Sequence, residues 1–529
     1  MGDVGSNALT WRLRGLLKGV EVERLAFVAT VIFAGATFWF APRLPMTDLP
    51  QHAGQVAVLH DLVLGTSKWE ALLHVNYFTP YLVGYSLALL LSFVLPVSAA
   101  LKLLLALAYY GFVAACVALR GRLGGDSRLD WLFIPGFFGF AYAWGFYTFL
   151  IAAPLGLLFV LLAHRYADRP TPALGVVLFL ADLALFFSHG LVFLFANCIG
   201  GMFLLLGCRR VAHLLPALLP YVAVGLWCLV YALVGLRFEA ARSGELFDIT
   251  WGWDLTRLDF LIFSMGWPTT GGFDANWTLT VLLLLVLGAP LVLGARFNRR
   301  DSTVFVPFLM VLLVWAFVPD AAMSTWFLYQ RFALFLLPFY ALMFQAPADP
   351  VPLGVMRRLW LPLLCWAFLA LYAERLRAFA TESAAFDEVL AAAQPGHRAL
   401  GLVLDQGSAA IRSRAVYAHF PLWYQAEKAG FVDFNFAVFL PQVVRYRLDR
   451  APATFRDTAS ASAWRIAEDF DWTRDQAAIY RYFFVRRTAP LPPAYFPAGR
   501  CEPVLLRSVG PWSVFENVNC HSASLPDVR

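Results

Sequence analysis

Apolar runs long enough to cross a membrane recur between residues 25 and 373. A helix needs about 20 mainly apolar residues to span the roughly 30 Å hydrocarbon core of a bilayer. One further apolar block, 131–163, is interrupted at Trp144–Tyr147, and a weaker run, 78–95, contains Pro80. This repetition indicates a multi-pass α-helical membrane protein. The clearest runs are at about 25–41, 98–119, 171–187, 189–207, 212–236, 277–295, 303–319, 328–346 and 359–373.

The composition excludes several other classes of protein. Hydrophobic residues make up 60% of the chain and charged residues only 14%, against about 25% charged residues in an average soluble protein. A soluble protein of this length needs more polar surface to cover its cores. The net charge of +6 is not gathered in a basic tract. We therefore exclude a soluble enzyme, a disordered chain and a coiled coil, and we expect no nucleic-acid partner.

Basic residues between the runs predict the topology, since short cytoplasmic loops are enriched in Arg and Lys. Such loops lie at 120–128, 164–169, 209–210, 296–300 and 357–358. They can all lie inside if 78–95 is not a full crossing; the alternative places 120–128 outside. The first run follows several arginines and has no cleavage site of the small-x-small type. The predicted fold has about eleven transmembrane helices, with residues 1–24 in the cytoplasm.

The same count of membrane crossings divides the chain into three parts, the first of which is the cytoplasmic segment 1–24. Residues 25–373 form the transmembrane domain, with outer loops at 42–77 and 237–276, and residues 374–529 form a small α/β domain outside the membrane. In this domain we expect strands at Leu400–Leu404 and Tyr480–Val485, a hairpin of Val504–Arg507 with Trp512–Phe515, and helices at Phe379–Ala393 and Ser460–Asp469. We predict a disulfide between Cys501 and Cys520, because these two residues flank the hairpin in an oxidising compartment.

Asp48 is the acidic residue that follows the first apolar run most closely in the outer loop. Pro50 fits the first turn of a helix, so Asp48 can cap that helix; alternatively, its carboxylate accepts a proton from a hydroxyl. His52, Gln55 and Leu59 fall on one helical stripe and predict an amphipathic helix at the membrane interface.

Other unusual polar residues fall on the same predicted side. His189 lies at a break between two apolar runs, and Tyr147 lies at the break that follows Trp144. Arg331, with Tyr329 beside it, begins another apolar run. This arginine either reaches to the interface or recognises phosphate. Asp182 is an acidic residue deep in an apolar run and is compatible with a transport path.

The C-terminal domain carries an aromatic and polar cluster of His419, Trp423, Tyr424 and Gln425. These side chains either stack on sugar rings or pack the domain against the membrane part.

This layout resembles that of the GT-C superfamily of membrane glycosyltransferases. The resemblance rests on Asp48 in the first outer loop, the helix after it, the breaks at Gly145–Tyr147 and Ser188–His189, the loop 237–276 and Arg331. It implies a sugar donor carried on polyprenyl phosphate and an acidic general base at Asp48. We further predict that Arg331 and Tyr329 bind the donor, while His52, His189 and Tyr147 contact or orient the substrate.

The sequence departs from the family pattern in its acidic residues. Leu49 follows Asp48 where many members have a second acid, and Tyr147-Thr148-Phe149 carries no carboxylate. We therefore predict no metal site, and no cofactor beyond the lipid-linked donor substrate.

The resulting hypothesis is a glycosyltransferase of the bacterial inner membrane that acts at the periplasmic face. Its partners would be membrane lipid, the lipid-linked donor and a saccharide, lipid or protein acceptor. The alternatives are a transporter or flippase for a lipid-linked saccharide, and a non-catalytic assembly partner.

Overall fold

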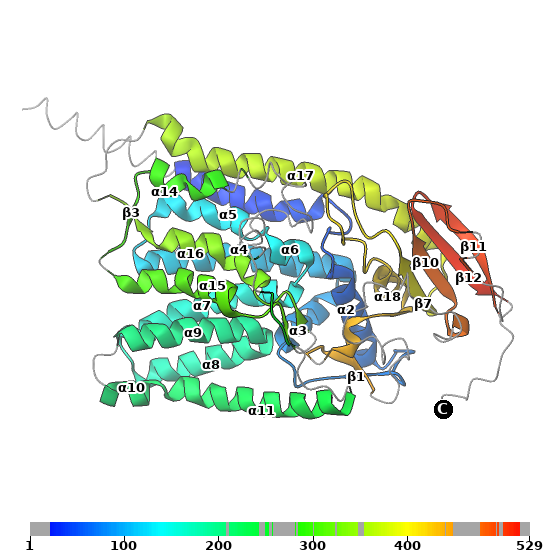
Figure 1. Cartoon of the computed structure of the whole chain (residues 1–529), viewed down its shortest axis with the longest axis horizontal. Helices are drawn as coiled ribbons and strands as arrows, with labels where there is room; N and C mark the ends of the chain where they lie inside the picture. The colour runs from blue at the N-terminus through cyan, green and yellow to red at the C-terminus, as the bar shows by residue number, and fades with distance from the viewer. Residues whose placement is uncertain are drawn as a thin grey trace, which may run out of the picture.

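The computed structural model is mostly helical, with long helices packed side by side and a sheet at one end (Figure 1). The structure describes residues 22–207, 211–242, 249–252, 257, 281, 284–299, 301–322, 325–347, 354–439, 441–447, 477–492, 495–496 and 501–518.

Five helices within these residues are long and apolar enough to cross a membrane. Five others are apolar but shorter. The chain therefore has the helices of a multi-pass membrane protein, whereas the predicted count of about eleven is not confirmed. The five longer spans are Val22–Trp39, α4 (Val97–Leu123), α7 (Tyr147–Asp168), α9 (Gly190–Gly207) and α17 (Val355–Ala392).

The shorter helices arise where prolines and 3-10 turns interrupt apolar runs. The run 328–346 begins as η4 (Gln330–Phe335), a 3-10 helix, and continues as α16 (Leu336–Leu342). The run 78–95 contains only α3 (Leu82–Ser92), whose 11 residues extend about 16 Å at 1.5 Å per residue. That length is half the hydrocarbon core, in agreement with the interpretation that 78–95 is not a full crossing.

The other helices range from single 3-10 turns to α11, which has 24 residues. They are η1 (Thr37–Trp39), η2 (Ser127–Leu132), α5 (Phe133–Gly136), α6 (Phe140–Trp144), α8 (Pro172–Ser188), α10 (Val211–Ala217), α11 (Leu219–Arg242), α14 (Ala289–Val292), η3 (Ser302–Phe305), α15 (Val306–Phe317) and η7 (Ala477–Ile479).

Three of the predicted cytoplasmic loops meet at one end of the helices. The N–H of Asp126 donates to the carbonyl of Phe344 (2.9 Å), and the N–H of Asn298 donates to that of Met343 (2.8 Å). Beside them, β3 (Arg296–Phe297) pairs with β6 (Phe344–Gln345). His164 reaches Thr303 Oγ1 from its ring Nε2 (3.2 Å). These three of the five predicted basic loops therefore lie at one end of the helices.

The first outer loop and the C-terminal part meet at the opposite end (Figure 1). The helix α2 (Leu49–Leu64) precedes β1 (Leu73–Val75), which pairs antiparallel with β9 (Val444–Tyr446). Because a ladder joins them directly, residues 42–77 and the chain after residue 374 lie on the same side of the membrane helices. Which side is periplasmic stays a prediction.

The C-terminal part contains a five-stranded sheet in the order β11-β12-β10-β7-β8. The pairs β10–β7 and β7–β8 are parallel, and β12 is antiparallel to both β10 and β11. The strands predicted from the sequence are present. The remaining elements here are α18 (Leu422–Lys428) and η5 (Phe436–Val438), with the strands β7 (Arg398–Val403), β8 (Phe431–Asp433), β10 (Tyr482–Arg486), β11 (Glu502–Val509) and β12 (Trp512–Val518).

A single helix connects the membrane part to this sheet. The predicted span 359–373 and the predicted helix Phe379–Ala393 are both parts of α17, which has 38 residues. It therefore continues through the predicted domain boundary at residue 373. Two further predictions, the helix Ser460–Asp469 and Cys520, lie outside the described residues. Cys501 is disulfide-bonded.

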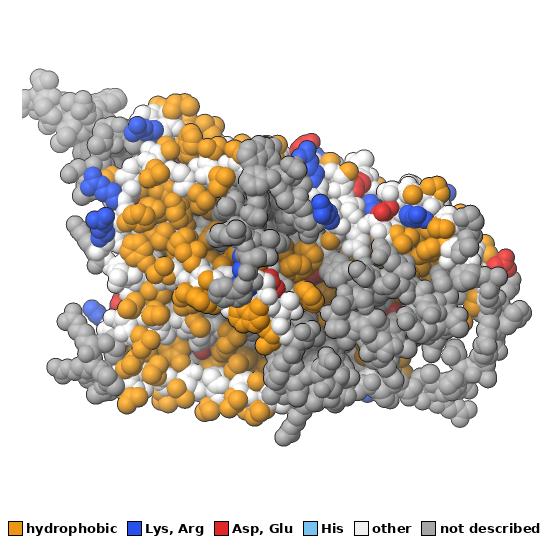
Figure 2. Space-filling view, in the orientation of Figure 1, with side chains coloured by type: hydrophobic (Ala, Val, Ile, Leu, Met, Phe, Trp, Pro, Cys, Tyr) orange, Lys and Arg blue, Asp and Glu red, His pale blue; other side chains and the backbone are white. Residues whose placement is uncertain are grey.

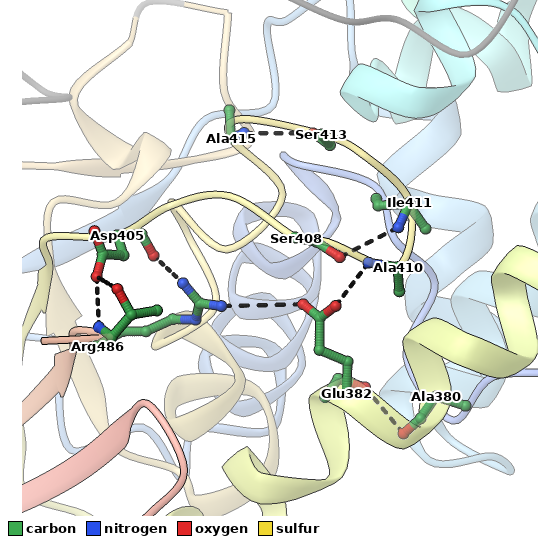
Figure 3. A network of polar contacts seen from close by, with 11 residues as sticks. Ala380, Glu382, Asp405, Ser408, Ala410, Ile411, Ser413, Ala415 and Arg486 are labelled. Carbon is green, nitrogen blue, oxygen red and sulfur yellow. Dashed lines mark hydrogen bonds and ion pairs between the residues drawn. The ribbon is translucent and has the colours of Figure 1, made fainter. Parts of the chain in front are cut away.

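A polar network fastens the loop after β7 to α17 (Figure 3). Glu382 of α17 accepts from the N–H of Ala410 (2.8 Å) and lies 4.0 Å from the guanidinium of Arg486. Arg486 donates in turn to the carbonyl of Asp405, whose carboxylate accepts from Thr488. The loop that leads to His419 is thus anchored on the long helix.

Arg43 makes a second connection between the two parts. It forms ion pairs with Asp387 of α17 and with Glu427 of α18, where Nη2 lies 2.8 Å from Oε2. Its guanidinium lies over the rings of Phe386 and Trp423. Arg43 is buried, so the two carboxylates, rather than water, stabilise its positive charge.

Apolar side chains cover much of the face of the bundle that Figure 2 shows. Leu180 of α8, Leu194 of α9 and Leu229 of α11 are each more than half exposed. Helices with such outward apolar faces are expected where hydrocarbon replaces water.

Cysteine labelling tests the predicted sides. Cysteines at Arg165 and Arg299 should resist a membrane-impermeant thiol reagent in intact cells, because they lie at the basic end, while cysteines at Thr66 and Arg507 should react. All four positions are exposed, so burial does not account for a difference. Labelling of Arg299 from outside would contradict the topology.

Arg43→Met should destabilise the protein by about 1–3 kcal/mol, since it removes charge-assisted hydrogen bonds and leaves two carboxylates without their cation. Arg507→Met is the matched control, because its pair with Glu388 is 53% exposed on both sides and contributes about 0–1 kcal/mol. Thermal unfolding in detergent measures both. Equal effects of the two substitutions would show that Arg43 does not join the two parts.

Candidate functional site

Asp48 is held at the start of α2 by a backbone contact with the Trp144–Tyr147 break. Its N–H donates to the carbonyl of Trp144 (2.8 Å). Gly145 has a φ of 91°, and a Cβ there would lie 2.9 Å from the nitrogen of Asp48. Both the backbone angle and the close approach require glycine. The glycine of this break therefore determines where Asp48 lies.

The side chain of Asp48 does not cap the helix. Asp48 occupies the N-cap position but makes no capping hydrogen bond. Its Oδ1 instead lies 3.4 Å from Nε2 of His419, and the Asp48 side chain is 10% exposed. Burial raises its pKa above the ordinary value of 3.8, against the opposing effects of His419 and Arg331. A buried carboxyl with raised pKa is a common property of acid–base groups.

The helix predicted around His52 is present as α2, but the prediction that it lies at the membrane interface is wrong. All residues of α2 from Leu49 to Val56 are buried. The polar stripe bonds to the C-terminal part: Oε1 of Gln55 accepts from the N–H of Val444 (3.1 Å). Gly54 allows α18 to approach, because a Cβ there would lie 2.9 Å from Nε2 of Gln425. The sequence shows a polar stripe but not which protein segment covers it.

His52 takes part in a buried chain of hydrogen bonds. Its Nδ1 lies 2.7 Å from the hydroxyl of Tyr85, which donates to Oε1 of Gln442 (2.8 Å). Burial lowers the pKa of His52 to about 3, so the imidazole is neutral. This chain fixes the ring beside Asp48, four residues away on the same helix.

Arg331 is buried rather than extended to the interface. Its Nε donates to the carbonyl of Phe327 (3.2 Å) and its Nη2 to that of Trp326 (2.8 Å). The guanidinium carbon lies 3.8 Å from the centre of the Phe146 ring. Arg331 forms no salt bridge with any residue that the structure describes, although it acts electrostatically on Asp48. A buried cation without a carboxylate partner can receive an anionic ligand.

His189 and Gln330 lie near this cation with unused polar atoms. His189 is 1% exposed and packs on the ring of Tyr81 at 5.0 Å. Its Nδ1 accepts from the N–H of Leu191 (3.2 Å), which leaves Nε2 as the ring donor. In the described part of the chain, Nε2 of His189 and Oε1 of Gln330 have no hydrogen-bond partner. Electrostatic contacts connect His189 with Arg331 and His52.

The two predicted tyrosines have other contacts. The hydroxyl of Tyr147 donates to the carbonyl of Leu101 in α4 (3.0 Å), while its ring lies 5.5 Å from that of His52. Tyr329 is buried, with the guanidinium of Arg257 4.3 Å from its ring centre. The ring of Tyr147 therefore lies next to the site. Tyr329 lies next to Arg257 of the loop 237–276, and most of this loop is outside the described residues.

His419 is the site residue whose role the sequence did not predict. The other three residues of its predicted cluster have structural contacts: Trp423 lies under Arg43, Tyr424 donates to the carbonyl of Gln394 (2.5 Å), and Gln425 accepts from Val432. His419 alone reaches Asp48. No spacing in the sequence relates these two residues, because the contact is made only when α18 packs on α2.

Asp182 lies apart from this cluster. Its Oδ1 accepts from Nδ2 of Asn197 (2.6 Å), which connects α8 with α9. The bond gives the carboxylate a structural partner.

Comparisons with known proteins give little support for a family. No protein-family model matches the chain, and no curated protein has significant sequence similarity to it. Among solved structures, it is similar to the arabinofuranosyltransferase AftD from Mycobacteria, determined by cryo-electron microscopy, with 14% identity and a TM-score of 0.45. The match covers 93% of this chain, which spans 40% of the other protein. A similarity this low assigns neither fold nor activity.

Proposed function

We propose that this protein is a membrane glycosyltransferase that moves a sugar from a polyprenyl-phosphate donor to an acceptor at the periplasmic face. The observation that carries the proposal is a buried carboxylate and a buried arginine beside one backbone break, where the arginine has no salt bridge to any residue that the structure describes. Asp48 contacts the break at Trp144 and Gly145, and Arg331 stacks on Phe146.

The carboxylate of Asp48 and the guanidinium of Arg331 match the two requirements of a sugar transfer, which are a base for the acceptor and a cation for the leaving phosphate. The acceptor oxygen attacks the anomeric carbon, and the bond between that carbon and the phosphate oxygen breaks. Polyprenyl phosphate leaves with the electron pair, while the acceptor proton moves to Asp48. Arg331 binds the phosphate, whose negative charge increases as it leaves. His189 supplies a second donor from Nε2, and His52 orients the substrate beside Asp48.

The pKa of Asp48 sets the expected pH dependence. A general base must be deprotonated, and burial raises the pKa of this carboxyl above 3.8. The rate of sugar transfer should therefore rise as the pH increases through the pKa of Asp48, and it should be low at pH values below that pKa.

Transport of a lipid-linked saccharide, or a non-catalytic assembly role, would use the same membrane location. A transporter needs a polar path, and Asp182 was its candidate residue; Asn197 already binds that carboxylate. We therefore retain the glycosyltransferase as the proposal.

Asp48→Asn should reduce sugar transfer by about 10²–10⁴-fold, because it keeps the shape of the side chain but removes the proton acceptor. Purified protein in liposomes is assayed with a panel of tritiated polyprenyl-phosphate pentoses and hexoses. Asp61→Asn, near the far end of α2, is the matched control and should retain activity. Near-normal turnover by Asp48→Asn would remove the base from the mechanism.

Arg331→Lys should raise the KM for the donor by about tenfold or more, since lysine keeps the charge but loses the planar fork that binds phosphate. The KM for the acceptor should change little. Arg120→Lys is the control, because Arg120 pairs with Asp130 at the opposite end of the bundle. Equal changes in both KM values would speak against phosphate binding by Arg331.

A further inference from the structure

Gln51 is held in one orientation by the C-terminal part. Its Oε1 accepts from the N–H of Phe436 (3.0 Å), and its Nε2 donates to the carbonyl of Phe434 (3.0 Å). A backbone N–H can only donate and a carbonyl can only accept. These two bonds therefore fix which side-chain atom of Gln51 is the nitrogen.

The orientation of Gln51 determines the tautomer of His419. Nε2 of Gln51 has a second hydrogen and lies 3.2 Å from Nδ1 of His419. Because an amide nitrogen donates only, Nδ1 must accept, and the ring carries its proton on Nε2. Nε2 lies 3.4 Å from Oδ1 of Asp48, so the ring proton is on the nitrogen that faces this carboxylate. The ring is 3% exposed and packs against Phe434 and Phe436.

We propose that His419 is a positioning residue for sugar transfer, which holds Oδ1 of Asp48 through its Nε2–H so that Oδ2 takes the proton of the acceptor hydroxyl. This inference rests on the proposed function. The imidazole keeps its own proton throughout, and the proton from the hydroxyl ends on Asp48. The C-terminal part of the chain therefore completes the site, because Phe434 and Phe436 orient Gln51, and Gln51 sets the tautomer of His419.

The contribution of His419 is separable from that of the other groups around Asp48. Arg331 of η4 acts on the carboxyl by its charge, Trp144 of α6 by a hydrogen bond, and His419 by both. Tyr85 of α3 also lies within electrostatic range. His419 is the one of these four residues that itself belongs to the chain after residue 374, and its removal should raise the pKa of Asp48.

The tautomer is tested first, without any substrate. Full-length protein labelled with ¹⁵N-histidine is placed in nanodiscs, and His419 is assigned by its loss in His419→Gln. Nitrogen-15 NMR should show an unprotonated Nδ1 and a protonated Nε2. A proton on Nδ1, or on both nitrogens, near neutral pH overturns the inference.

The role in transfer is tested with the same panel of tritiated donors. His419→Phe keeps a flat ring without a donor and should lower kcat by about 10- to 100-fold, as expected for one hydrogen bond to a charged group. The acid limb of its rate profile should move to higher pH, and the donor KM should stay unchanged. His419→Gln places an amide donor near the position of Nε2 and should restore most of the rate.

Two comparisons separate the inference from the proposed function. Tyr424→Phe alters the same packed segment away from Asp48 and should keep the wild-type pH profile. Normal kcat in His419→Phe together with an inactive Asp48→Asn overturns the role of His419 alone. An active Asp48→Asn overturns the proposed function and the role of His419 with it. Loss of rate in both His419 variants with an unmoved acid limb would show a merely structural histidine.

Discussion

The burial of α2 beneath the C-terminal part is the contact on which the site depends. A helix that carries Gln51, His52 and Gln55 on one face cannot be buried unless each polar group finds a partner. Backbone groups at Phe434, Phe436 and Val444 bond the two glutamines, and Tyr85 bonds His52. Nε2 of Gln51 also lies 3.2 Å from Nδ1 of His419, whose Nε2 lies 3.4 Å from Oδ1 of Asp48. Packing of the two parts and assembly of the site are therefore one event.

A second constraint acts from the membrane side. The close approach of Gly145 to Asp48 leaves no space for a side chain at that break, and Phe146, the next residue, stacks on Arg331. The same backbone turn thus contacts both residues, and among the described residues no salt bridge joins the carboxylate and the guanidinium. A direct ion pair would neutralise both groups, whereas separated charges stay available for a ligand in a site of low dielectric.

The sequence predicted single features better than their surroundings. Asp48, Arg331 and His189 were singled out because polar groups beside apolar runs are costly, and the structure brings them together. The strands of the C-terminal part followed from alternating residues and a Gly-Pro turn. The membrane helices were less predictable, because prolines and 3-10 turns shorten runs such as 328–346, and α17 merges two elements that composition separates. His419 has no local signal.

The sequence by itself therefore determined that the chain is a multi-pass membrane protein, where its breaks occur and which residues carry unusual charge. These properties follow from hydrophobicity and residue chemistry, which act locally along the chain. Only the tertiary structure decided that α2 is buried, that the side chain of Asp48 does not cap its helix, and that Nε2 of His419 lies 3.4 Å from its carboxylate. Those outcomes depend on contacts between the two ends of the chain, whose geometry results from packing and from the need to satisfy every buried polar group.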